Sequence, residues 1–110
     1  MSGPTNPAGL SFTAPTLYTD GTAMPAGEVT SFDYGYGAVT GNYTRIVNDP
    51  TMKLSGGKIA ALIPTDLAFG QWFAAGRART KDGAVAAWGN EVAFVVAAKT
   101  PAPITDFGVA

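Results

Sequence analysis

Glycine and proline divide this sequence into short segments, and that punctuation constrains its fold more than any other feature. The 110 residues include 14 Gly and 8 Pro. Both residue types interrupt helices and favour turns, so few stretches are long enough for a stable helix, and short apolar or alternating runs lie between them. The sequence therefore predicts an all-β domain.

Several of these runs have the pattern of strands. Apolar side chains alternate in two sets: Phe32, Tyr34 and Tyr36, and then Val92, Phe94 and Val96. Side chains two residues apart share one face of a strand, so each set is expected to face a core. Residues 59–63, IAALI, form a short apolar run that periodicity alone assigns neither to a strand nor to a helical turn. The turn-like Pro64-Thr65-Asp66 that follows favours a strand.

Residues 70–96, GQWFAAGRARTKDGAVAAWGNEVAFVV, indicate two strands joined by a polar turn, and they closely resemble the end of a fibronectin type III domain. Family members carry a run of the form G-T-Y-Y-F-A-V-R-A, then a Gly-containing loop, then S-x-W-S-N-E-V-x-F. The ungapped counterparts here are Gly70, Trp72, Phe73, Ala75, Arg77 and Ala78, followed by Asp82-Gly83 and Trp88-Gly89-Asn90-Glu91-Val92-Ala93-Phe94.

Two earlier segments follow the order of the same family. Residues 10–16, LSFTAPT, and Asp20-Gly21-Thr22 resemble its L-S-W-T-A-P-T strand B and D-G-T loop, with Phe12 where Trp is usual. Residues 28–44, EVTSFDYGYGAVTGNYT, resemble the strand C pattern I-T-G-Y-x-V-Y-Y-G and the S-G-N-Y-T turn of bacterial and phage members. The resemblance covers most of residues 10–96 and implies an immunoglobulin-like antiparallel β-sandwich.

The length allows a single core, and we expect one domain with two extensions. These are a flexible N-terminal arm over residues 1–9, the sandwich over 10–99 and a tail over 100–110. The start, MSGPTNPAG, lacks the basic and apolar stretches of a signal peptide, and no run approaches the ~20 apolar residues of a membrane span. We therefore expect the protein to be made in the cytoplasm of the cell that produces it, which for a phage protein is the host, and we expect no membrane partner. With zero Cys, packing alone must hold the sandwich.

The residue inventory argues against catalysis. The chain has no His and no Cys, so the usual bases, thiol nucleophiles and soft metal ligands are missing. Most of its 8 carboxylates adjoin Gly, Pro or Thr, where Asp commonly builds turns. We therefore assign them to turns and surfaces, and we expect no enzymatic activity, no cofactor and no metal site.

The charge of the chain gives no reason to expect nucleic acid as a partner. The net charge is -1, and phosphate binding needs clustered cations. Arg77, Arg79 and Lys81 alternate along one strand, and we expect them on a solvated face. Only 14% of residues are charged, against about 25% in typical soluble domains. A surface so poor in charge is often one that other subunits cover.

The large apolar residues divide into a predicted core and a predicted interface. The predicted core residues are Phe12, Phe32, Tyr34, Trp72, Val92 and Phe94. Trp72 replaces the family Tyr whose hydroxyl bonds back to the backbone, so we expect that bond not to form in the same way. Trp88 is predicted either to cover the sandwich edge or to contact a partner, and Tyr43 is the other candidate contact residue.

The tail, TPAPITDFGVA, resembles the P-x-A-P-x-x-L-x-V that opens a following module, which is strand A of the family fold. The chain, meanwhile, already reaches strand B at residue 10. The tail is either frayed or serves as strand A, in its own domain or in a neighbour. Exchange between copies would make the protein a homo-oligomer, with Pro101, Pro103, Ile104, Phe107 and Val109 at the interface.

A signal-free, non-catalytic module of the bacterial and phage type resembles a virion component. The resemblance implies a capsid decoration, or cement, protein of a tailed bacteriophage, whose partners are the major capsid protein or other virion subunits. Two alternatives stay open. One is a module that binds glycan or a host surface through Tyr43 and Trp88, and the other is a tail-tube or tail-tip accessory domain.

Overall fold

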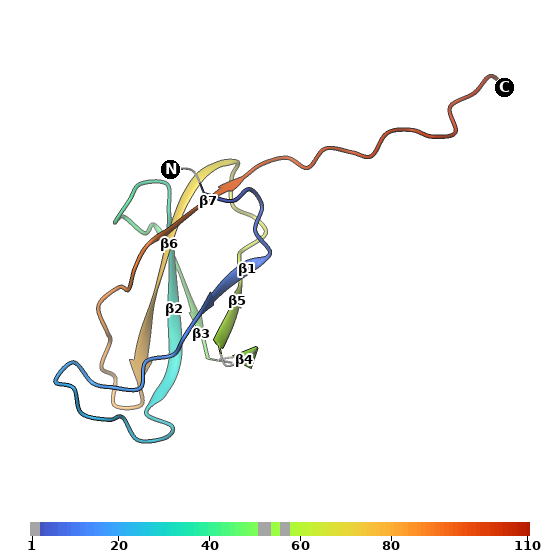
Figure 1. Ribbon diagram of the computed structural model, residues 1–110. Helices are drawn as coiled ribbons and strands as arrows, with labels where there is room; N and C mark the ends of the chain where they lie inside the picture. The colour runs from blue at the N-terminus through green and yellow to red at the C-terminus, as the bar shows by residue number, and fades with distance from the viewer. Residues whose placement is uncertain (1–2, 51–53, 56–57) are drawn as a thin grey trace.

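The computed structural model describes residues 3–50, 54–55 and 58–110, and these form seven strands in two antiparallel sheets (Figure 1). One sheet has the order β1-β5-β4 and the other the order β3-β2-β6-β7. The strands are β1 (Gly9–Phe12), β2 (Val29–Gly37), β3 (Arg45–Asp49), β4 (Leu54–Ser55), β5 (Lys58–Leu62), β6 (Gly70–Thr80) and β7 (Val92–Val96). The described residues contain no helix, and the two sheets pack as a β-sandwich, which confirms the all-β prediction.

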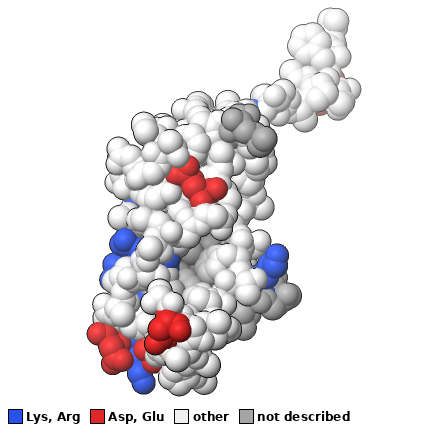
Figure 2. Space-filling model, turned by 60° about the vertical axis from the view of Figure 1, so that its left-hand side comes forward, with Lys and Arg blue, Asp and Glu red and all other residues white. Residues whose placement is uncertain are grey.

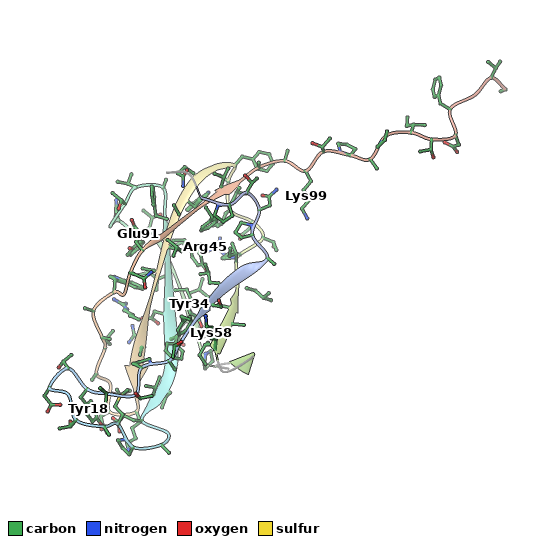
Figure 3. The ribbon with its side chains drawn as sticks, viewed as in Figure 1. Tyr18, Tyr34, Arg45, Lys58, Glu91 and Lys99 are labelled. Carbon is green, nitrogen blue, oxygen red and sulfur yellow. The ribbon has the colours of Figure 1, made fainter. Side chains whose placement is uncertain are left out.

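Strand β2 lies at the centre of the larger sheet and supplies much of the core. It pairs with β3 from Phe32↔Asp49 to Tyr36↔Arg45, and with β6 along its whole length. Phe32, Tyr34 and Tyr36 are 2%, 3% and 0% exposed, so the alternation in the sequence correctly places them on the inner face. Figure 3 shows Tyr34 between the two sheets.

The facing sheet completes this core. The run at 59–63 does form a strand, β5, which buries Ile59 and Ala61. From β1, the partly buried Phe12 meets the Phe32 ring at 4.8 Å between centroids and an interplanar angle of 73°. Phe94 of β7 is 2% exposed and contacts Tyr36 in the same edge-to-face manner, with centroids 6.4 Å apart. The predicted core residues Phe32, Tyr34 and Phe94 therefore lie in the core, and Phe12 packs against it.

Val92 was predicted in the core, and this prediction is wrong. Its side chain is 43% exposed. Strand β7 is the edge strand of its sheet, and Val92 is the first residue of that strand. Its side chain therefore borders an open groove between the sheets, although two residues later Phe94 is buried.

Trp72 is only partly buried, packing against the core from β6. Its indole Nε1–H donates a hydrogen bond to the backbone carbonyl of Ala68 at 2.8 Å. The bond expected of a Tyr hydroxyl does not form in the same way, because here the donor is an indole nitrogen and the acceptor is a carbonyl four residues upstream.

The N-terminal segment is joined to β7 and is not a free arm over residues 4–6. Asn6 N–H donates to the Val95 carbonyl at 2.7 Å, and Val95 N–H donates to the Pro4 carbonyl at 2.8 Å, so the two segments run parallel. The Asn6 side chain bonds Ala97 with both of its polar atoms, at 3.0 and 2.9 Å. Residues 1 and 2 of the predicted arm lie outside the described residues.

The chain forms no further strand after Val96, and residues 97–99 lead into the tail, residues 100–110. Figure 1 shows the tail running away from the sandwich, which is consistent with overall extents of 72 × 29 × 21 Å. Ile104, Phe107 and Val109 are 72%, 89% and 103% exposed. The tail therefore presents apolar side chains to solvent without packing on its own domain.

Candidate functional site

The outer face of the larger sheet carries a connected group of polar and aromatic side chains, which we call the outer-face cluster. Its members are Asp33, Tyr43, Arg77, Arg79, Trp88 and Glu91. They come from β2, β6, the turn between β2 and β3, and the segment before β7. Pairing of Asp33 with Arg77 across β2 and β6 brings the charged members together.

Asp33 is the buried anion of this cluster, at 1% exposure. One of its oxygens, Oδ2, accepts from Nε of both Arg77 and Arg79 at 2.8 Å, and the other accepts from Asn48 Nδ2 at 2.9 Å. Burial raises the pKa of the Asp33 carboxyl, but the bonds from Asn48 and the two guanidinium groups outweigh it, so the net shift is downward. Asp33 was assigned to a turn or surface role, and this is wrong because alternation along β2 turns it toward the two arginines.

Arg77 and Arg79 do share one strand face, as predicted, but they are paired with a buried carboxylate. Arg77 also places its guanidinium carbon 4.1 Å from the centre of the Trp88 ring. The Asp33 carboxylate and the Trp88 ring together stabilise the Arg77 guanidinium group, which is only partly exposed.

Tyr43 and Trp88, the two aromatic interface candidates, contact each other edge to face with centroids 5.0 Å apart. They lie over Gly35 of β2, where a Cβ atom would come within 2.8 Å of Tyr43 Cγ and 3.0 Å of Trp88 Cη2. Because Gly35 has no side chain, both rings can pack closely against the backbone of β2 at this position. Both are partly buried, so Trp88 covers the outer sheet face.

Glu91 holds the turn between β2 and β3 in place (Figure 3). Its carboxylate accepts hydrogen bonds from Thr40 Oγ1, from Gly41 N–H at 2.8 Å and from Tyr43 Oη at 2.9 Å. The Thr40 bond, followed by the Gly41 bond, lowers the pKa of Glu91. Burial and then the Glu91 carboxylate raise the pKa of Tyr43. Glu91 therefore acts as a structural acceptor.

The outer-face cluster does not present a free acid or base. Asp33 is bound by two guanidinium groups and Glu91 by three donors. Within the described ranges, no three His, Cys, Asp or Glu side chains gather in a way that could hold a metal ion. Nor does any helix in that part of the chain have the length and apolarity to cross a membrane.

A second feature is a groove of about 460 Å³ on the open side of the sandwich, which we call the edge groove. One wall is β1, and the other comprises residues 74–78 of β6 and the segment from Ala86 to Val92. Small residues dominate the second wall, including Ala74, Ala87 and Gly89. Sequence reasoning missed this groove, because it arises from the arrangement of two sheet edges.

The remaining candidate interface residues lie apart from both features. Pro101 and Pro103 are exposed, as are Ile104, Phe107 and Val109. The structure thus brings Tyr43 and Trp88 together on one face and leaves the predicted tail residues projecting from the pole at which β7 ends (Figure 1).

Comparisons with protein-family models, with curated proteins and with solved structures gave no match. The function is therefore inferred from the outer-face cluster, the edge groove and the tail.

Proposed function

We propose that the sandwich is of the immunoglobulin-like, fibronectin type III kind. Its strand orders support this assignment. Sheet β1-β5-β4 corresponds to strands B, E and D, and sheet β3-β2-β6-β7 to strands C′, C, F and G. The bond from Trp72 to the Ala68 carbonyl occupies the place of the corner tyrosine bond of such sandwiches.

The proposed function is that of a non-enzymatic virion structural protein, a capsid decoration protein of a tailed bacteriophage. The observation that carries it is the tail, which exposes Ile104, Phe107 and Val109 at 72%, 89% and 103%. Large apolar side chains exposed close together in one segment are candidates for protein–protein contact. The virion assignment itself rests on the resemblance to bacterial and phage modules, since a fold alone does not fix a function.

The surface charge supports a role among other subunits. On the face that Figure 2 shows, charged side chains are few, several of them lie close together at its lower end, and most of the remaining area is uncharged. Several further apolar residues of the sandwich are exposed, among them Leu62 at 85% and Phe69 at 73%. Such a surface suits burial against protein partners better than isolated existence in solution.

The glycan-binding alternative receives less support from the geometry. Stacking on a sugar needs an open aromatic face, whereas Arg77 lies over the Trp88 ring and Tyr43 meets it edge to face. The Tyr43 hydroxyl is also bound to Glu91. These contacts use the groups that would otherwise recognise a saccharide.

The proposal is tested by adding purified protein to undecorated phage capsids and sedimenting the particles. We expect saturable co-sedimentation and a higher temperature of capsid disruption, because binding only to the intact shell stabilises it. Unassembled capsid subunits and an unrelated β-sandwich of similar size serve as controls. Absence of bound protein at saturating concentration contradicts the proposal, and binding of polysaccharide by the monomer would favour the alternative.

A further inference from the structure

The outer edge of β1 is open. Strand β1 lies at the end of its sheet and pairs only with β5, from Gly9↔Leu62 to Phe12↔Ile59. No described residue pairs with its other edge. An edge of this kind exposes backbone N–H and C=O groups and accepts a further strand. The edge groove lies directly alongside it, with Leu10 and Phe12 among its lining residues.

We infer that the tail of one copy adds as a strand to the free edge of β1 in a second copy of this chain. The tail is exposed throughout and has the length of an ordinary strand. Strand addition of this kind draws affinity from main-chain hydrogen bonds and specificity from alternate side chains. The inference goes beyond the proposed function, because it concerns contacts between copies and holds whatever larger assembly they join.

The two prolines of the tail determine which of its edges can pair. Successive residues of a strand direct their backbone polar groups to opposite edges, and Pro has no N–H to donate. Pro101 and Pro103 therefore share one edge, which must face solvent. Ala102, Ile104 and Asp106 present the opposite edge, which has its donors intact and is the one that pairs with β1.

The same alternation matches the tail side chains to the edge groove. Phe107 and Val109 lie on one face of an extended tail together with the two prolines. The groove offers them a wall of small residues, including Ala74 and Ala87, and Arg77 is the one charged residue among the described residues that line it. In the groove, the side chains of Phe107 and Val109 would be buried against apolar residues. The side chain of Val92, which is 43% exposed in the single chain, would be covered as well.

The segment that leads into the tail, residues 97–99, favours insertion of the tail into a neighbouring copy. Asn6 bonds the backbone N–H and C=O of Ala97, which holds the chain in line with β7 as it leaves the sandwich. Figure 1 shows β7 running toward the pole at which β1 begins, with the tail continuing away from it. Reaching its own groove would require the chain to reverse direction immediately after this held residue, whereas the groove of another copy requires no such reversal.

The first test is disulfide trapping in the isolated full-length protein, which has zero Cys. Ser11 is exposed on β1, and Ile104 lies at the centre of the pairing edge. Mixing a Ser11→Cys chain with an Ile104→Cys chain under mild oxidation should give a mixed disulfide dimer. Thr105→Cys is the matched control and should give at least tenfold less, because its side chain points to the other face. Equal trapping by the two positions overturns the inference.

The second test is complementation. Phe107→Asp removes the tail anchor, and Ala87→Arg fills the groove; each alone should weaken self-association at least tenfold in analytical ultracentrifugation. Because both residues are exposed, the melting temperature should not change when it is measured below the concentration at which the parent associates. Mixing the two variants leaves one intact tail and one intact groove, so a mixed dimer should form at the concentration at which the parent associates.

Two further results overturn the inference. One is a parent protein that remains monomeric up to about 1 mM, which corresponds to a binding free energy weaker than about 4 kcal/mol. The other is an intramolecular disulfide in the doubly substituted Ser11→Cys, Ile104→Cys chain, which would place the tail in its own groove. Neither test measures binding to capsids. The proposed strand exchange and the proposed capsid function can therefore each fail while the other stands.

Discussion

Tyr34 and Tyr36 enter the same core from one face of β2, but their hydroxyl groups meet different surroundings. The Tyr34 hydroxyl donates to Asp49 Oδ2 at 3.0 Å, whereas the Tyr36 hydroxyl is buried without a hydrogen-bond partner among the described residues. A buried polar group without a partner costs free energy, while a paired one contributes a modest gain.

Removing the two hydroxyl groups should therefore have opposite effects on stability. Tyr34→Phe should lower the free energy of unfolding by about 1 kcal/mol, and Tyr36→Phe should raise it by about 1 kcal/mol or leave it unchanged. Urea denaturation of both variants beside the parent measures the difference. Equal losses in the two variants would show that the Tyr36 hydroxyl has a partner.

Gly35→Ala should destabilise the protein and displace the aromatic pair above it. The new Cβ would come within 2.8 Å of Tyr43 Cγ and 2.9 Å of Tyr43 Cβ, atoms too close to the backbone to move freely. We expect a loss of about 1–3 kcal/mol, typical of overpacking. Gly76→Ala on β6 is the matched control, because its nearest contact would be 3.7 Å. The idea fails if the two alanine variants unfold at the same denaturant concentration.

Asn6 variants separate a hydrogen-bond effect from a backbone effect. Asn6 has a positive φ of 48°, which Gly adopts freely and Ala does not. Asn6→Gly should cost about 1–2 kcal/mol through the two bonds to Ala97, and Asn6→Ala should cost about 1 kcal/mol more. Hydrogen exchange at Ala97 N–H should accelerate in both variants. An unchanged rate of hydrogen exchange at Ala97 N–H would show that Asn6 does not hold the segment that leads into the tail.

Stability should depend on pH only at the two extremes. The pKa of Asp33 is lowered from 3.8, so its contribution is complete above about pH 5 and is lost as the pH falls through the folded-state value. Burial raises the pKa of Tyr36 from 10.0 to about 12, so stability falls as the pH rises above 10. The chain has no His and no Cys, so a plateau is expected between about pH 5 and 9.

Denaturation midpoints measured from pH 2 to pH 11 test this profile. Asp33→Asn should be less stable than the parent on the plateau, and its acid decline should be shallower, because the carboxylate that loses its partners on protonation is gone. An acid decline identical to that of the parent would remove Asp33 from the explanation.

Trp72→Phe should lower the free energy of unfolding by about 1 kcal/mol, since it keeps most of the packing but removes the indole N–H that Ala68 accepts. Trp72→Ala should cost about 3 kcal/mol, near the lower end of the range for aromatic core truncations, because the side chain is partly exposed. Calorimetric melting of both variants gives the comparison, and equal losses would mean that the hydrogen bond contributes nothing.

The inner face of β2 could be predicted from the sequence because it depends on a local period. Alternation places Phe32, Tyr34 and Tyr36 together whatever the strand pairs with. Val92 shows the limit of this reasoning. Its spacing from Phe94 is correct for a shared face, but its burial depends on whether the facing sheet extends over the edge of β7, and that is decided by distant segments.

The outer-face cluster shows the same limit more clearly. Tyr43 and Trp88 could each be singled out as aromatic residues near loops, but their contact depends on Gly35, which has no side chain to signal its role. Asp33 meets Arg77 only through the register of β2 on β6. Such pairings are set by the whole sheet, and a local pattern does not contain them.

The parallel pairing of residues 4–6 with β7 has a mechanical consequence. A pull on the tail draws β7 along its own direction, while an opposing pull on the N-terminal segment draws residues 4–6 backward along the same axis. The bonds joining Pro4 and Asn6 to Val95 and Ala97 would then be loaded together in shear, not opened one after another. The sandwich should resist tension between its ends far better than its short edge contact suggests.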